Sequence, residues 1–258
     1  MKPDANTLGS WRDAIHARAW SGLTVWTPAL AGWLVLYWGA TNMDSPAAQL
    51  TMPMSYWSVS NWVAVFMMWA VMMAAMMLPS AMPMVSVFEK LNRERREGSR
   101  TLAFVAGYLA LWTAFGAGAS AAQWGLQTNG FVSPMIVSVS PVLSGALLVI
   151  AGVFQFTPLK HACLRACRTP LGFLMTDWRD GLWGATRMGI RHGLYCLGCC
   201  WALMALLFVG GAMNLLWIAA LTLLVAIEKL APKGNIIAKA LGVLMIGAGF
   251  ARLAFLPE

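Results

Sequence analysis

The sequence predicts an all-α fold, a polytopic helical membrane protein with about seven transmembrane helices. Three observations support this prediction. Hydrophobic residues make up 59% of the 258 residues and charged residues only 11%, whereas a soluble domain carries about 25% charged residues. Several apolar runs reach the roughly 17–25 residues that a spanning helix needs. The Lys and Arg residues are confined almost entirely to alternate connections between these runs, which is the charge pattern of a membrane protein.

The apolar runs predict the spans in chain order. An N-terminal segment, residues 1–21, precedes them and lacks the continuous apolar core of a signal peptide. We therefore expect the first span to insert the chain into the membrane. A single membrane domain, residues 22–258, follows this segment. Its spans are expected at about 22–40, 61–88, 102–124, 135–156, 192–209, 213–227 and 236–255.

The distribution of basic residues predicts the orientation. Every Lys and Arg except Arg252 lies in the N-terminal segment or in a loop on the same side of the predicted membrane. Positively charged loops remain in the cytoplasm, so we expect a bacterial-type inner-membrane protein with its N-terminus cytoplasmic and its C-terminus outside. The net charge of +8 comes from basic residues in the short loops between spans of the lipid bilayer. No nucleic-acid partner is therefore expected.

The long cytoplasmic loop, residues 157–191, is expected to contain secondary structure. Thr157-Pro158 and Thr169-Pro170 each have the pattern of an N-cap followed by proline at the first helical position. They predict two short helices that lie near the membrane surface.

All five cysteines, and two of the three histidines, fall between residues 161 and 200. Positions four residues apart share one face of a helix, and this step recurs among these cysteines and His192. Thiolates are soft ligands that suit Cu(I) or zinc, and the loop between the fourth and fifth spans can bring the two groups together. The predicted metal ligands are Cys163, Cys167, His192, Cys196, Cys199 and Cys200. Nearby positive charge favours the thiolate that binds metal, and the expected sources are Lys160, Arg165, Arg168 and Arg191.

Two other interpretations of this window remain. A free cysteine can be a small buried hydrophobe with only a packing role, although five in one window at helical spacing are hard to attribute to packing. A disulfide is disfavoured because the predicted location is reducing. His161 is expected to point away from Cys163. The residues of this window alone do not distinguish a copper site from a zinc site.

The predicted second span contains a run of methionines. Eight of the 18 methionines lie in residues 66–84, and many of them step by four along the helix. A thioether is a neutral soft ligand that suits Cu(I) and binds zinc poorly, so copper is the favoured ion and zinc the alternative. Methionine also fills gaps in apolar cores, and that interpretation stays open. The second predicted set of metal-binding positions is Met68, Met72, Met73, Met76, Met77, Met82 and Met84.

Two adjacent charged residues, Glu228 and Lys229, close the predicted sixth span. We expect a local ion pair or an anchor at the membrane interface. The alternative is that Glu228 balances the charge of the cation site or of the basic loop.

Three stretches of the chain, MMAAMMLPSAMPM, FQFTPLKHACLRACRTP and DWRDGLWGATRMGIRHGLYCLGCCWALM, resemble a family of predicted metal-binding integral membrane proteins. Members are associated with copper delivery to copper enzymes of the tyrosinase type. The resemblance covers about residues 60–250 and is most specific over 155–204. The resemblance implies a copper-chaperone-like role. It also implies that the family's metal ligands correspond to Cys163, Cys167, Cys196, Cys199 and Cys200 of this chain.

The leading hypothesis is therefore a membrane protein that binds Cu(I), moves or delivers it, and passes it to a cuproenzyme or a partner copper chaperone. No catalytic residues and no enzyme activity are expected. One alternative is a membrane thiol–disulfide redox protein that uses Cys163 with Cys167 or Cys199 with Cys200. Another is a structural subunit of a larger membrane complex with a zinc site.

Overall fold

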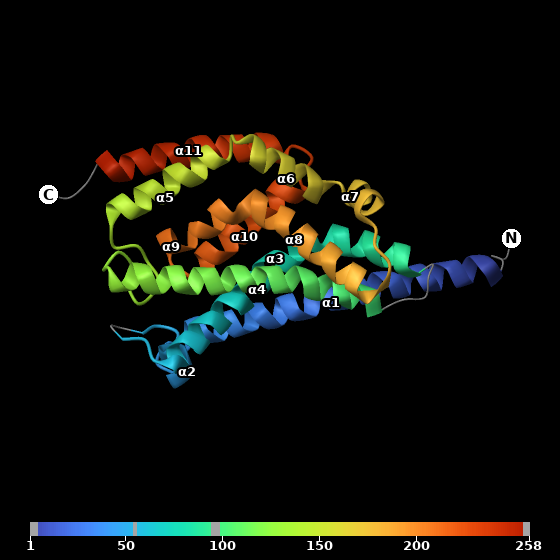
Figure 1. Ribbon diagram of the computed structural model, residues 1–258, viewed down its shortest axis with the longest axis horizontal. Coiled ribbons are helices and arrows are strands. Elements are labelled where there is room, and N and C mark those ends of the chain that lie inside the picture. The colour runs from blue at the N-terminus through green and yellow to red at the C-terminus, as the bar shows by residue number, and fades with distance from the viewer. Residues whose placement is uncertain (1–4, 54–55, 94–98, 255–258) are drawn as a thin grey trace.

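The computed structural model describes the backbone of residues 5–53, 56–93 and 99–254, and side chains from residue 22 onward within these ranges except at residue 93. These residues form a bundle of helices that run mostly along one common axis (Figure 1). The described residues contain no β-strand beyond an isolated antiparallel bridge between Val132 and Ser138, so the predicted all-α fold is confirmed there. The helices are α1 (Ala5–Thr41), α2 (Pro46–Leu50), α3 (Val59–Arg93), α4 (Ser99–Thr128), α5 (Pro141–Phe154), α6 (Pro158–Arg168), α7 (Pro170–Asp177), α8 (Gly181–Ala205), α9 (Leu207–Gly210), α10 (Leu215–Leu230) and α11 (Gly234–Ala254).

Four helical segments among the described residues are long and apolar enough to cross a membrane: Val59–Asn92, Ser99–Thr128, Gly181–Gly210 and Gly234–Ala254. A fifth is obtained if α5 and α6, which are bent by 65° at a short break, count as one broken span. This result is consistent with a membrane protein. The count of seven spans and the orientation stay predictions. Of the expected N-terminal segment, residues 1–4 and all side chains lie outside the described part of the chain.

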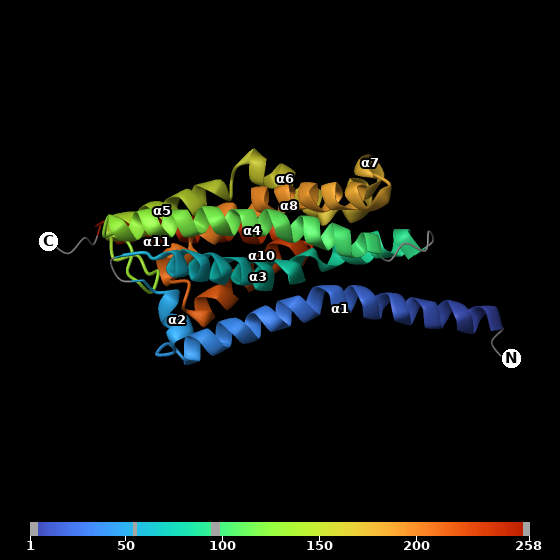
Figure 2. The same cartoon turned by 60° about the horizontal axis from the view of Figure 1, so that its bottom comes forward.

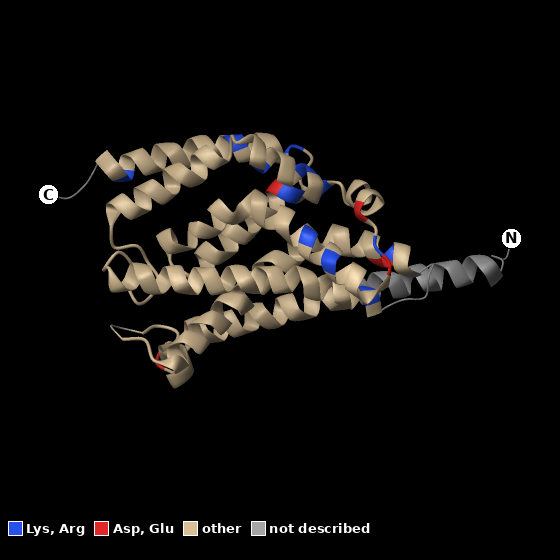
Figure 3. Cartoon of the chain, in the orientation of Figure 1, with Lys and Arg blue, Asp and Glu red and all other residues tan. Residues whose placement is uncertain are grey.

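Charged side chains are unevenly distributed along the bundle. Figure 3 shows most described Lys and Arg residues in the half of the bundle nearer the N-terminal end, while the last turn of α11 holds Arg252. Asymmetry of this kind is what the positive-inside rule describes.

Three predicted starts of spans differ from the starts of the helices. The first span was expected to begin at residue 22, but α1 begins at Ala5. The fourth span was expected to begin at residue 135, but α5 begins at Pro141, with Ser140 as its N-cap. Residues 132–138 instead form a turn closed by the β-bridge, and Ile136 has a φ of 61°. The fifth span was expected to begin at His192, but α8 begins at Gly181. His192 and the cysteines that follow it are therefore in the interior of a long helix, not at its start.

The two short helices predicted after residue 157 are present as helices. The Thr157 hydroxyl caps α6 by accepting a hydrogen bond from the backbone N–H of Lys160 at 3.3 Å, and Pro158 occupies the first helical turn. Pro170 likewise begins α7, although Thr169 makes no side-chain capping bond. Proline suits this position because its missing N–H would have no helical partner there.

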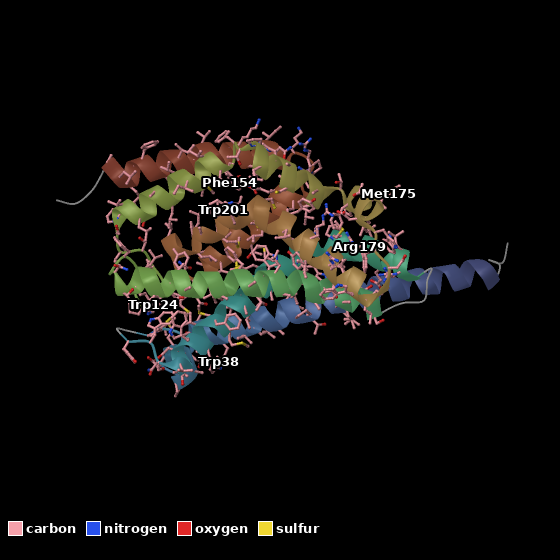
Figure 4. The ribbon with its side chains drawn as sticks, in the orientation of Figure 1. Trp38, Trp124, Phe154, Met175, Arg179 and Trp201 are labelled. Atoms are coloured by element: carbon pink, nitrogen blue, oxygen red, sulfur yellow. The ribbon has the colours of Figure 1, made fainter. Side chains whose placement is uncertain are left out.

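Close packing between α4 and α8 brings backbone against backbone. A Cβ atom added at Gly107 of α4 would collide with the carbonyl oxygen of Thr186, and one added at Gly189 of α8 would collide with that of Phe104. The two glycines thus allow a close approach in the way small residues do in membrane helices. The helix α8 also packs on α5, where the Phe154 and Trp201 rings meet edge to face at 5.2 Å (Figure 4).

The remaining helices surround this pair. The long helix α3 packs against α4 and α10, and α1 runs along its outer side (Figure 2). The helix α11 packs against α5, and α6 packs across α8. The cysteines of α8 and most methionines of α3 are thereby buried in the interior of the bundle, and the cysteines of α6 are half-buried against it.

Candidate metal centre

Five free thiols come from two helices that pack on each other. Cys196, Cys199 and Cys200 of α8 are at most 2% exposed, whereas Cys163 and Cys167 of α6 are half-buried. Because α6 packs across α8, the two groups of predicted ligands approach each other, although they are far apart in sequence.

Cys199 is the thiol that joins the two helices. Its thiol lies near the thiols of Cys167 of α6 and Cys200 of its own helix, close enough for their side chains to interact electrostatically. The thiols of Cys199 and Cys200 donate hydrogen bonds to the backbone carbonyl of Cys196, at 3.0 and 2.9 Å. Four of the five cysteines therefore lie close together.

The fifth cysteine, Cys163, reaches α8 at a glycine. A Cβ atom added at Gly198 would lie 2.7 Å from Cys163 Sγ, well inside van der Waals contact. The absence of a side chain at Gly198 thus makes room for this sulfur beside Cys199. Cys163 packs against the hydrophobic core without a hydrogen bond to another thiol in the described contacts.

Cys196 is contacted by two polar groups from other helices. Nζ of Lys229, from α10, lies 2.8 Å from Cys196 Sγ. The hydroxyl of Tyr108, from α4, lies 3.0 Å from the same sulfur and 3.1 Å from the carbonyl oxygen of Met77. Lys229 also donates to Ser80 Oγ of α3 at 3.1 Å. All four side chains are buried.

The charged neighbours differ from the expected ones. Lys160 pairs with Glu228 at 2.6 Å, Arg168 donates to the backbone carbonyls of Ala231 and Pro232, and Arg191 pairs with Asp177. The cation in hydrogen-bond contact with a thiol is instead Lys229. The expectation of a local pair between Glu228 and Lys229 is therefore wrong, and Glu228 balances a residue of the basic loop, which was the stated alternative.

The Lys160–Glu228 pair joins α6 to α10 in a buried environment, with side-chain exposures of 0% and 2%. We expect Lys160→Met to destabilise the protein by about 3–5 kcal/mol, because removing one partner leaves an uncompensated buried charge. Unfolding of the purified protein in mixed micelles measures this change. The double variant Lys160→Met/Glu228→Gln is the control and should recover most of the loss. A loss below about 1 kcal/mol in the single variant would contradict the role assigned to the pair.

His192 lies apart from the thiols, among aromatic rings. Its ring centroid is 5.6 Å from that of Tyr108, 5.8 Å from that of Phe173 and 6.0 Å from that of Phe104. Its Nδ1 is buried and has no hydrogen-bond partner among the described residues. The structure therefore does not join His192 to the cysteines, although one ring nitrogen remains available as a ligand.

Most methionines of α3 lie in the core of the bundle, whereas Met67 is exposed. Five of them are at most 1% exposed, and Met68 and Met82 are partly buried against the same core. Met68 also lines a pocket of about 210 Å³ between α1, α2, α3 and the start of α10, together with Met67 and Met213. The buried members are Met72, Met73, Met76, Met77 and Met84.

The thiols are close together but do not form a complete coordination cage. Within the described ranges, no group of three or more His, Cys, Asp or Glu side chains is arranged to hold a metal ion. The reason is local, because Cys199 and Cys200 are bonded to a backbone carbonyl and Cys196 to Lys229 and Tyr108. Coordination by these sulfurs requires rotation of their side chains.

Three residues of this arrangement were not predicted as site residues: Lys229, Tyr108 and Ser80. Lys229 carried a signal in the sequence, because a charged pair at the end of an apolar span is costly to bury and is retained where it has a function. Tyr108 and Ser80 carried none, since a single hydroxyl in an apolar helix is common.

The family model described as PpoB2, copper chaperone, matches residues 66–252 of the chain. This range includes all five cysteines, His192, Lys229 and every methionine of the predicted second set. Among curated proteins and solved structures, nothing matches the chain.

Proposed function

The chain belongs to the PpoB2 copper-chaperone family, and from this membership and the geometry of the thiols we propose that it binds Cu(I) within the membrane and delivers it to an apo-cuproenzyme or a partner copper chaperone. The observation that carries the proposal is the packing of α6 on α8, which brings Cys163 Sγ against Gly198 and Cys167 near Cys199. The helices α6 and α8 each contribute thiols to the same site. Thiolates select soft ions such as Cu(I) over hard cations.

The thiol site consists of Cys163, Cys167, Cys196, Cys199 and Cys200, with His192 as a further candidate ligand. Its sulfurs are deprotonated when they bind metal. Rotation about χ1 is required to bring these neighbouring sulfur atoms into contact with one ion. Copper is favoured over zinc because thioether ligands line the neighbouring helix and bind zinc poorly.

The methionines of α3 supply a route between the pocket and the thiols. Residues four apart on a helix are about 6 Å apart along its axis, so Met68, Met72 and Met76 form a column of evenly spaced thioethers. The column begins at the pocket that Met68 lines. It ends near Met77, whose carbonyl is linked through Tyr108 to Cys196. A soft cation moves along such a column by exchange of one sulfur ligand for the next.

Metal analysis of the detergent-purified protein tests this proposal. Copper is expected in the native protein, and none in a variant with all five cysteines replaced by serine, because a hydroxyl is a hard ligand. The matched control is Met72→Leu/Met76→Leu, which conserves core volume. It should keep its thiol-bound copper and lose Cu(I) movement into sealed vesicles.

The other outcomes identify the rival functions. Zinc without copper in the native protein would indicate a structural zinc site. A thiol–disulfide redox function is favoured by one observation, the contact between the adjacent free thiols Cys199 and Cys200. That function requires reversible oxidation of the thiols in a protein that binds no metal, and thiol titration after mild oxidation would detect it.

A further inference from the structure

The ammonium group of Lys229 is built into the thiol site. Its Nζ lies 2.8 Å from Cys196 Sγ and 3.1 Å from Ser80 Oγ, so groups from α8 and α3 hold it in place. The residue is 7% exposed, and it comes from the last turn of α10. A buried lysine is rare unless it is paired, and here its contacts include the sulfur of a candidate copper ligand.

The other basic groups near this place are engaged elsewhere. Lys160 is neutralised by Glu228, and the Arg168 guanidinium is bonded to backbone carbonyls at the end of α10. The Lys160–Glu228 pair adds no net charge to the neighbourhood. Lys229 therefore gives the thiol site a positive charge that no carboxylate in contact with it offsets among the described salt bridges.

The charge of a bound metal depends on the ion. Cu(I) held by two thiolates carries one negative charge, whereas Zn(II) held by two thiolates is neutral. Adding the Lys229 ammonium makes the copper complex neutral and the zinc complex positive. In a buried site of low effective dielectric constant, a net charge is costly, so the lysine favours the monovalent ion.

We propose that Lys229 determines the metal specificity of the thiol site, by balancing the charge of a two-thiolate Cu(I) complex and disfavouring divalent soft ions. The proposal rests on the proposed Cu(I)-binding function. A sulfur atom has lone pairs enough to bind the ion and to accept the lysine N–H at once, so Lys229 acts as a positioning residue and is not itself a ligand.

Affinities of the full-length protein in detergent for Cu(I) and for Zn(II), measured separately by competition with chromophoric chelators, test the proposal. In Lys229→Met the Cu(I) affinity is expected to fall about 10- to 100-fold, the range typical for loss of a group that supports a metal ligand. The Zn(II) affinity is expected not to fall. Lys229→Arg keeps the charge and should keep the preference for Cu(I).

Two controls separate charge from structure. Lys239→Met makes the same substitution at an exposed position of α11 and should change neither affinity. Ser80→Ala removes one contact that holds the ammonium and leaves every thiol and Lys229 in place. The preference for Cu(I) over Zn(II) should therefore fall, but by less than in Lys229→Met. If Lys229→Met does not fold, Ser80→Ala decides the question alone.

The outcomes are distinct. A ratio of Cu(I) to Zn(II) affinity that falls at least tenfold in Lys229→Met, or that falls in Ser80→Ala, supports the assignment. Equal losses for both metals, or an unchanged ratio, overturn it and leave Lys229 a structural residue. If the native protein binds no Cu(I), the proposed function fails first, and this inference fails with it.

Discussion

Replacing Cys199 by serine is expected to lower the affinity for Cu(I) by more than about 100-fold. Loss of a group that merely supports a metal ligand costs 10- to 100-fold, and loss of a ligand itself should cost more. Cys199 is the position where this effect should be largest, because its thiol lies near those of Cys167 on α6 and Cys200 on α8. Without the Cys199 thiol, Cys167 of α6 loses its neighbouring sulfur on α8.

The matched control is Cys163→Ser, the same substitution at a half-buried sulfur that reaches α8 only beside Gly198. We expect about a tenfold loss or less there. Titration of both variants with a Cu(I) chelator, together with thermal unfolding of the metal-free proteins, measures the difference. Equal effects of the two substitutions would show that the thiol pair joining α6 and α8 is not the centre of the site.

Placing an alanine at Gly107 is expected to destabilise the protein by about 3 kcal/mol, the upper end of the usual range for overpacking. The new Cβ would collide with the Thr186 carbonyl oxygen across the interface between α4 and α8. A backbone atom cannot rotate away as a side chain can, so the two helices must separate. Separation of α4 from α8 also moves Tyr108 away from Cys196, and we expect Cu(I) binding to weaken with stability.

The control is Gly118→Ala on the same helix, where an added Cβ meets no atom within 4 Å. Alanine is a better helix former than glycine, so this variant should gain about 0.5–1 kcal/mol. Unfolding in mixed micelles compares the two variants. Similar stabilities for both would mean that α4 and α8 do not pack as closely as the structure indicates.

Much of the secondary structure follows from local pattern. The apolar runs predicted α3, α4 and α11 with ends within a few residues of those observed. The proline after a threonine correctly predicted the starts of α6 and α7. These successes depend on interactions between residues that are close in sequence, such as capping and apolar periodicity.

The wrong starts of α5 and α8 have different physical causes. Residues 135–137 are apolar, which favoured a span, but the N-cap at Ser140 and the proline after it begin the helix later. Arg187 and Arg191 suggested a loop, yet both lie in α8, where Arg191 faces Asp177 of α7. Hydropathy alone cannot distinguish a charged helical turn with a partner from a loop.

The candidate site was predictable as a set of residues and not as a set of contacts. Spacing indicated that cysteines would share helix faces, but it could not indicate that Lys229 contacts Cys196 or that Tyr108 lies between Met77 and that sulfur. Those contacts depend on how α4, α8 and α10 pack, which is set by residues far apart in the chain. The same reason explains why Glu228 pairs with Lys160 and not with its neighbour.

The attachment of α6 to α10 has a consequence for the speed of ion exchange. Lys160 and Arg168 fix α6 through contacts that include no cysteine, so the packing of α6 on α8 does not depend on metal binding. A site that is already organised loses little conformational freedom on binding. Under the proposed function, loading and release would require side-chain rotation and replacement of one sulfur by another, motions far faster than local unfolding. The contacts that hold the helices in position would then also give a low kinetic barrier to release of the ion.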